Sequence, residues 1–101
     1  MLSANISSQT RKAVYRRDHY RCALCDSTRG LQIHHVMKRS QGGLDTEQNL
    51  ITLCMYCHAV IHGTKFPEWP DWMDQEELQQ AAVEYLADLY AGHWYPWVRG
   101  V

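Results

Sequence analysis

The sequence predicts a single α+β domain over residues 1–101, with a small metal-bearing core between an N-terminal helix and an amphipathic C-terminal helix. Three observations lead to this class. A chain of 101 residues has room for one domain with a modest core. Two Cys-x2-Cys pairs and four histidines fall within residues 22–62, among short apolar segments. A stripe of apolar residues at helical spacing then follows within residues 66–101.

The first predicted element is a helix from Ser8 to about His19, because Ser8 is a suitable N-cap residue and no Gly or Pro interrupts the segment. Three side chains would face inward: Ala13, Val14 and Tyr20. Three arginines would lie on the exposed side: Arg16, Arg17 and Arg21.

Short elements are predicted to follow, with candidate metal ligands where they join. These are a strand over residues 31–36, a turn or loop over 40–43, a strand over 50–53 and a helix over 54–62. Gly63 would end that helix, since glycine adopts the left-handed conformation common after a helix C-terminus.

The C-terminal part is predicted to be a linker over residues 66–73, stiffened by Pro67 and Pro70, and then a helix from about Asp74 to Ala91. Asp74 with Glu77 resembles a capping box. The apolar stripe consists of Leu78, Ala81, Ala82, Tyr85, Leu86 and Leu89. We expect it to pack back on the core, against Ala13, Val14 and Tyr20, in a monomer; a self-complementary dimer contact is the alternative. Four tryptophans are interpreted as packing residues: Trp69, Trp72, Trp94 and Trp97.

Charge is distributed unevenly along the chain. Residues 1–65 carry nine Lys/Arg and four Asp/Glu, a net +5, whereas residues 66–101 carry one Arg and seven acids, a net −6. The basic part could face a polyanion such as nucleic acid. No apolar run is long enough to cross a membrane, and the opening residues do not resemble a signal peptide. We therefore expect a cytoplasmic protein with metal-bound thiolates rather than a secreted disulfide framework.

The four cysteines, in two Cys-x2-Cys pairs, predict a closed tetrahedral zinc site on Cys22, Cys25, Cys54 and Cys57. A redox-active cysteine pair is the competing interpretation. Four sulfurs and four imidazoles are more than one metal can use, so the histidines are left for a second, open site, which is typical of hydrolases.

Spacing divides the histidines into ligands and one spare group. Cys57 and His58 are neighbours on the predicted helix and point about 100° apart, whereas His62 lies one turn beyond His58 on the same face. His34 and His35 are neighbours on a strand and diverge as well. One of the two can complete a metal site with His58 and His62, and the other is free to act as a base.

These motifs together resemble the HNH endonuclease family. The matching residues are Cys22-x2-Cys25, Leu31-x-Ile33-His34-His35, Gly42-Gly43, Asn49-Leu50, Leu53-Cys54-x2-Cys57-His58 and His62. The resemblance covers about residues 15–63, and residues 66–101 have no part in it. The His, Asn and His that name the family match His35, Asn49 and His58.

The resemblance implies a treble-clef-like ββα-metal fold that cuts DNA phosphodiesters with one divalent metal, which is Mg²⁺, Mn²⁺, Ni²⁺ or Zn²⁺, beside the structural Zn²⁺. By likeness to the nuclease domains of DNase colicins, His34 is a ligand with His58 and His62, and His35 is the general base. Asn49 would orient His35 or brace the loop. Five basic residues are candidates for DNA phosphate contacts: Arg16, Arg17, Arg21, Lys38 and Arg39.

Simpler interpretations stand beside these roles. His62 could only cap its helix, Asn49 could be a turn residue, and Lys38 and Arg39 could be solvated loop charges. The chain as a whole could be a non-catalytic zinc module that binds nucleic acid or a protein. The family resemblance also implies a setting of phage DNA packaging, restriction or DNA mobility, with DNA-processing partner proteins, and no residue selects one of these.

Overall fold

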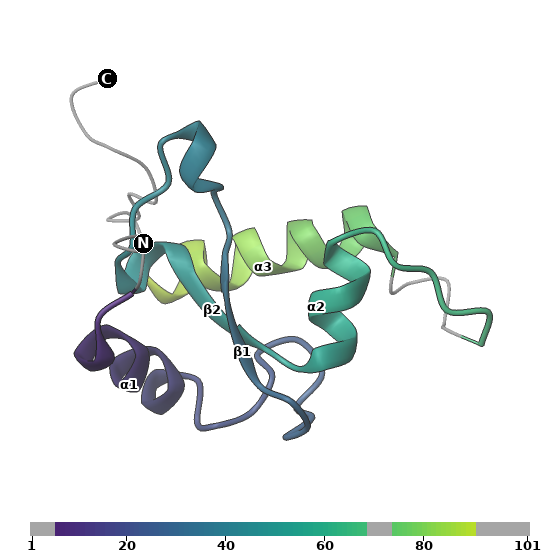
Figure 1. The fold of residues 1–101 in the computed structure, drawn as a ribbon, viewed down its shortest axis with the longest axis horizontal. Helices are drawn as coiled ribbons and strands as arrows, with labels where there is room; N and C mark the ends of the chain where they lie inside the picture. The colour runs from purple at the N-terminus through teal and green to yellow at the C-terminus, as the bar shows by residue number, and fades with distance from the viewer. Residues whose placement is uncertain (1–5, 69–73, 91–101) are drawn as a thin grey trace.

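The computed structural model describes residues 6–68 and 74–90 and shows a mixed fold of helices around a two-stranded antiparallel sheet (Figure 1). The elements in chain order are α1 (Ser8–Arg17), β1 (Gln32–His35), η1 (Arg39–Gln41), η2 (Glu47–Asn49), β2 (Leu50–Leu53), α2 (Met55–Ile61) and α3 (Gln75–Leu89), with η marking 3₁₀ turns. The sequence β1, β2, α2, with a cluster of four cysteines at its joints, is the predicted ββα-metal arrangement.

Helix α1 begins at Ser8 as expected but ends earlier than expected, at Arg17. Its N-cap is Ser7 rather than Ser8, and the Ser7 hydroxyl accepts a hydrogen bond from the Thr10 amide at 3.1 Å. The helix stops at Arg17 because His19 and Tyr20 have positive φ values, 62° and 56°, which no α-helix continues through. The expected inward position of Tyr20 is wrong: its side chain turns outward, is 54% exposed and stacks on Tyr15.

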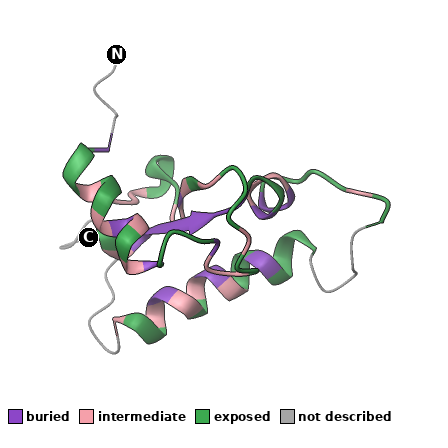
Figure 2. Cartoon of the chain, turned by 90° about the horizontal axis from the view of Figure 1, so that it is seen from below, coloured by how far each residue is buried: buried purple, intermediate pink, exposed green. Residues whose placement is uncertain are grey.

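Strands β1 and β2 pair in register from Gln32 opposite Leu53 to His35 opposite Leu50. All four residues of β2 are buried, because α1 contacts this strand while α2 follows it and folds back on the sheet. Figure 2 shows this buried strand in the interior, in purple. In β1 only His34 is buried, and His35 is half-exposed. The edge strand therefore presents its two histidines differently.

Two clusters form the core. The larger joins the cysteine site and β2 to the stripe of α3 through Leu78, Ala82 and Leu86. The smaller holds Ile6, Val14 and Leu50 on the α1 side of the sheet. The α3 stripe thus packs on the core as expected, but against α2 and the cysteine site rather than against Val14. Leu89, expected in the stripe, is 45% exposed. Burying a leucine such as Leu86 fully contributes roughly 1.5–3 kcal/mol, so this contact is a large part of a small core.

A buried ion pair connects α1, β2 and α3. Asp18 is 2% exposed; its carboxylate accepts hydrogen bonds from the Arg17 guanidinium at 2.8 Å, the Thr52 amide at 2.9 Å and the Tyr85 hydroxyl at 2.6 Å. Arg17 also donates to the carbonyl oxygens of Glu47 and Leu50, both at 2.7 Å, and to the hydroxyl of Tyr90 at 3.1 Å. Arg17 was expected on the exposed side, and that expectation is wrong because this network takes up its guanidinium.

Helix α3 is capped as predicted, since the Asp74 carboxylate accepts from the Glu77 amide at 2.8 Å. The tryptophans, the second half of the linker and the tail after Tyr90 lie outside the described residues. Among the helices within residues 6–68 and 74–90, none has the length and apolar character needed to cross a membrane.

Candidate metal centres

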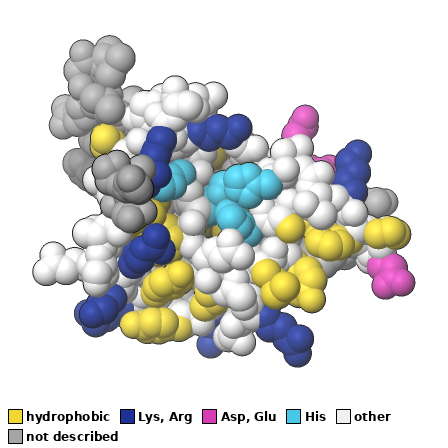
Figure 3. All heavy atoms as spheres, in the orientation of Figure 1, with side chains coloured by type: hydrophobic (Ala, Val, Ile, Leu, Met, Phe, Trp, Pro, Cys, Tyr) yellow, Lys and Arg dark blue, Asp and Glu magenta, His cyan; other side chains and the backbone are white. Residues whose placement is uncertain are grey.

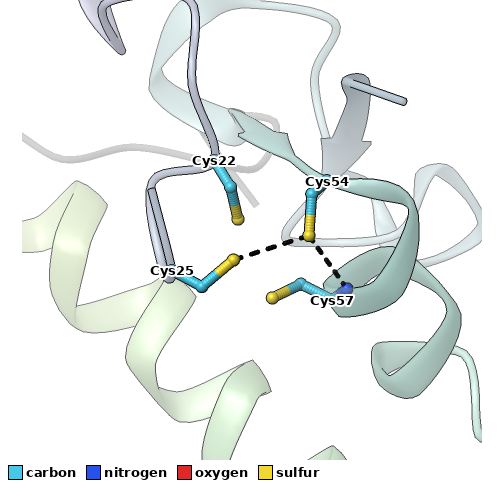
Figure 4. Close-up of side chains that lie close together, drawn as sticks. All are labelled: Cys22, Cys25, Cys54 and Cys57. Carbon is cyan, nitrogen blue, oxygen red and sulfur yellow. Dashed lines mark hydrogen bonds between the residues drawn. The ribbon is translucent and has the colours of Figure 1, made fainter. Parts of the chain in front are cut away.

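The four cysteines converge at the junction between the loop after α1 and the start of α2 (Figure 4). Their sulfurs lie within 4.8 Å of one another, and Cys25 Sγ is 3.5 Å from Cys54 Sγ. A tetrahedral zinc with Zn–S bonds of about 2.3 Å separates its sulfurs by about 3.8 Å. No disulfide joins them, so the arrangement fits a closed Cys₄ metal site.

Local turns present these sulfurs. The amide of Cys22 donates to the Ser27 carbonyl, and the Asp26 amide returns to the Cys22 carbonyl, which closes a tight turn around the first pair. Asp26 adopts a left-handed backbone conformation in this turn, with φ of 66°. Cys54 is the N-cap of α2, and its sulfur accepts from the Cys57 amide at 3.4 Å. Backbone geometry thus holds both pairs in place.

Proton binding at the four sulfurs is strongly coupled. A hydrogen bond from Cys57 lowers the pKa of Cys22 to about 5, and the same hydrogen bond, followed by burial and the other sulfurs, raises the pKa of Cys57. Burial raises the pKa of Cys25 to about 11. Four thiolates at this distance would repel one another, and a bound cation would relieve that repulsion, so the cluster fits a metal site.

Three histidines form a second cluster. His34 of β1 meets His58 and His62 of α2, with all three ligand atoms within 4.8 Å of one another. The Nε2 atoms of His58 and His62 are 3.1 Å apart, which suits two nitrogens on one metal with bonds of about 2.1 Å. His34 is buried and His62 exposed, so one side of the cluster is open to solvent. Figure 3 shows the histidines gathered on one face of the molecule.

Burial keeps the inner imidazoles neutral. It lowers the pKa of His34 to about 3, with His58 and His62 adding to the effect. Burial and the proximity of His62 also lower the pKa of His58. A neutral imidazole has the free lone pair that a metal ligand needs, so the three residues fit a divalent cation.

His35 has a different partner from its neighbour His34. Its Nε2 lies 2.6 Å from the Asp45 carboxylate, and Arg39 Nε donates to the same oxygen at 2.9 Å. Burial raises the pKa of Asp45, but the hydrogen bonds from Arg39 and His35 outweigh it and hold that pKa below its usual value. Sequence reasoning did not identify Asp45. Its only signal was an acid in the loop between the histidine pair and Asn49.

Asn49 is fully buried and braces the loop after β1. Its Oδ1 accepts from the Met37 amide at 2.7 Å, and its Nδ2 donates to the carbonyl oxygens of Met37 and Leu44, both at 2.9 Å. Gly43 lies so close that an added Cβ would be 2.9 Å from Asn49 Nδ2 and overlap the Met37 carbonyl. Of the two expected contributions, the geometry corresponds to loop bracing, and it is Asp45 that contacts the His35 ring.

One cleft of about 440 Å³ is lined by His34, His35, His58 and His62. Of the five basic residues proposed for phosphate contacts, Lys38 and Arg39 line this cleft, whereas Arg16 and Arg21 are exposed elsewhere and do not. Arg17 is held in the buried network. The cleft also has a wall that the sequence did not predict, formed by Gln75 and Gln79 of α3.

Comparisons with known proteins agree with this geometry. Residues 22–63 match the family model of HNH endonucleases. A type IV methyl-directed restriction enzyme of Escherichia coli (strain K12), EcoKMcrA, is 43% identical over 42 residues, which are 42% of this chain and 15% of that enzyme. Anaredoxin of Nostoc sp. (strain PCC 7120) is 33% identical over 55 residues, 54% of this chain and 72% of that protein. The match to the restriction enzyme is thus confined to a small part of it.

Proposed function

This chain belongs to the HNH endonuclease family, and from that premise we propose that it is a metal-dependent endonuclease that hydrolyses phosphodiester bonds of DNA. One observation carries the proposal: the three clustered histidines and His35 line the same open cleft, and the Asp45 carboxylate orients the His35 ring. A module that only binds nucleic acid has no need of this arrangement.

His34, His58 and His62 would hold the catalytic divalent metal, and their exposed side leaves room for substrate. A metal bound there would neutralise a phosphate oxygen and stabilise the charge that develops on the leaving oxygen. The four cysteines would hold a separate structural zinc, which fixes the start of α2 and with it the positions of His58 and His62.

His35 would be the general base. With the Nε2–H group donating a hydrogen bond to Asp45, the lone pair on Nδ1 is free to accept a proton from the attacking water. Asp45 would keep the imidazole in this tautomer and orientation, and Arg39 would hold Asp45 in turn. A positioned base of this kind contributes on the order of 10²–10⁴-fold to the rate.

DNA would be held mainly through its phosphates. Lys38 is exposed at the edge of the cleft and Arg39 lies beside it, so phosphates flanking the reacting bond can be bound there. The relation to a restriction enzyme is confined to 42 residues, which are 15% of that enzyme.

The test is cleavage of supercoiled plasmid by the zinc-loaded protein, with Mg²⁺, Mn²⁺, Ni²⁺ or Zn²⁺ added in turn and with a chelator as control. Metal-dependent conversion to nicked or linear DNA, lost in His35→Ala, would support the proposal. A protein that binds the plasmid in every condition but cuts it in none would be a non-catalytic zinc module, and the endonuclease proposal would be wrong.

A further inference from the structure

Helix α3 forms part of the histidine cleft although it lies outside residues 22–63, where the family match ends. It packs beside α2 (Figure 1). Gln75 and Gln79, one turn apart in its first half, line the cleft that holds His34, His35, His58 and His62. This part of the cleft lining therefore comes from the C-terminal extension and not from the residues that match the family.

The two glutamines differ in what their amides are free to do. Gln75 Nε2 donates to the Ile61 carbonyl at 2.9 Å, which fixes the start of α3 against the end of α2 next to His62. Gln79 is exposed, and within residues 6–68 and 74–90 its side-chain amide makes no hydrogen bond. Gln75 is thus an anchor, and Gln79 is the residue whose donor and acceptor both remain available to a substrate.

Charge differs between the two walls of the cleft. Lys38 and Arg39 lie on the loop after β1, whereas the α3 wall is uncharged at Gln75 and Gln79. Gln79 also borders a shallow hollow with Glu76 and Glu77, whose carboxylates repel phosphate. Flanking phosphates are therefore favoured on the loop side, and the α3 side is left to an uncharged part of the nucleotide.

We propose that Gln79 contacts the nucleoside, at its sugar or base edge, next to the phosphate that is cleaved. A glutamine amide suits this task because it donates and accepts at once, so it can pair with a base edge or donate to the ring oxygen of the sugar. This inference rests on the proposed endonuclease function. It adds a local nucleotide preference to an enzyme whose other DNA contacts are to phosphate.

The experiment compares wild type, Gln79→Ala and Gln80→Ala on one plasmid and on short duplexes with randomised base pairs. Gln80 is the matched control, because it is exposed on the same helix, bonds to Glu84 at 3.0 Å and does not line the histidine cleft. Steady-state kcat and KM are measured, and the ends of the products are sequenced. Zinc and catalytic-metal content are measured for each protein.

Losing one such hydrogen bond should raise KM about two- to tenfold in Gln79→Ala, with a smaller change in kcat and unchanged metal content. Gln80→Ala should match the wild type. A changed nucleotide preference at the cut ends assigns the contact to a base edge, and a raised KM with unchanged preference assigns it to the sugar. Identical kinetics and cut ends in both variants would overturn the inference while leaving the endonuclease intact. A wild type that cuts no DNA would overturn both.

Discussion

His34 and His35 are adjacent in the chain, yet the two imidazoles have different partners. His34 is buried and turned toward His58 and His62, while His35 is half-exposed and turned toward Asp45. The alternation of a strand produces this difference, because successive side chains point to opposite faces. One dipeptide can therefore supply both a metal ligand and a base to the same cleft.

Substitution should separate these two roles. We expect His35→Ala to lower the cleavage rate about 10²- to 10⁴-fold with nearly unchanged affinity for the catalytic metal, because the ligand cluster stays intact. His34→Ala and His58→Ala should weaken metal affinity and cleavage together. Calorimetric metal titration of the zinc-loaded variants, alongside cleavage rates, measures both quantities.

His19→Asn is the matched control for these substitutions. His19 is an exposed histidine with φ of 62° outside the cleft, and asparagine tolerates that conformation. It should leave both metal affinity and cleavage unchanged. If His35→Ala lost the metal while His34→Ala kept it, the assigned roles would have to be exchanged.

Residue types and spacing predicted that His58 and His62 meet one of the two adjacent histidines, but not the contacts that depend on tertiary structure. The His58–His62 pair follows from one helical turn and could be read from the sequence. Asp45 could not, because its approach to His35 depends on the path of the loop over residues 36–49. Arg17 looked like an exposed arginine until the fold placed the Asp18 carboxylate and two backbone carbonyls around it.

At the scale of elements, the cysteine site fastens the loop after α1 to the start of α2. Each sulfur pair belongs to a separate turn, and backbone hydrogen bonds from Ala23 to Thr52 and from Met55 to Arg29 also join the two segments. Cys22, Cys54 and Cys57 are also buried members of the larger core cluster. A metal bound by the four cysteines would therefore stabilise the packing of this region.

Replacing Cys54 with serine should leave the chain largely unfolded or insoluble. Metal binding at a structural zinc site contributes on the order of 10 kcal/mol, and most of the stability of so small a core depends on it. Circular dichroism and bound-zinc analysis of Cys54→Ser would measure the effect. A soluble, fully folded variant without zinc would rule out the structural site.

The Arg17–Asp18 network predicts a dependence of stability on pH. Burial raises the pKa of Asp18, but hydrogen bonds from Arg17 and Tyr85, with the Thr52 amide, lower it below the ordinary value. Because the folded pKa is the lower one, the contribution to stability is present above an unfolded pKa of about 4 and is lost as pH falls through the folded pKa.

Asp18→Asn should therefore destabilise the protein at neutral pH, by about 3 kcal/mol or more, since it leaves Arg17 buried without its counter-charge. The difference in unfolding free energy between wild type and variant should shrink as pH falls below about 4. Urea unfolding over a pH series measures it, with the exposed Asp88→Asn as control. Comparing variants at each pH cancels any acid release of zinc common to both. A difference that stays constant with pH would contradict the assignment.

The bounds of an element were predicted almost to the residue where its own sequence marks them, by an apolar run or a capping residue. Strand β2 has the expected bounds, and α3 begins after its predicted cap, Asp74. The end of α1 was missed, because the positive φ values of His19 and Tyr20 are imposed by the turn that leads to Cys22. Nothing in the residue types at those positions signals this conformation.

Over the whole chain, the net positive charge belongs to residues 1–65 and the net negative charge to residues 66–101. Phosphate contacts should therefore dominate DNA affinity, and we expect cleavage of unrelated plasmids at similar rates, falling steeply between about 50 and 200 mM salt. Initial rates over a salt series on several plasmids check this. Cutting confined to one defined sequence, or rates insensitive to salt, would contradict it.

Helix α3 closes the core of the whole molecule as well as walling the cleft. Leu86 is fully buried against the α2 and cysteine-site side of the core, so Leu86→Asp would place an unpaired charge there. We expect a loss of about 3 kcal/mol or more in unfolding free energy, or an insoluble protein. Leu89→Asp, on the same helix but 45% exposed, should change stability by only about 0.5 kcal/mol. Urea unfolding of the two variants tests whether α3 stabilises the core or is a segment that the core does not need. If Leu86→Asp remained as stable and as active as Leu89→Asp, α3 would not hold the core together and would instead be available to a separate partner.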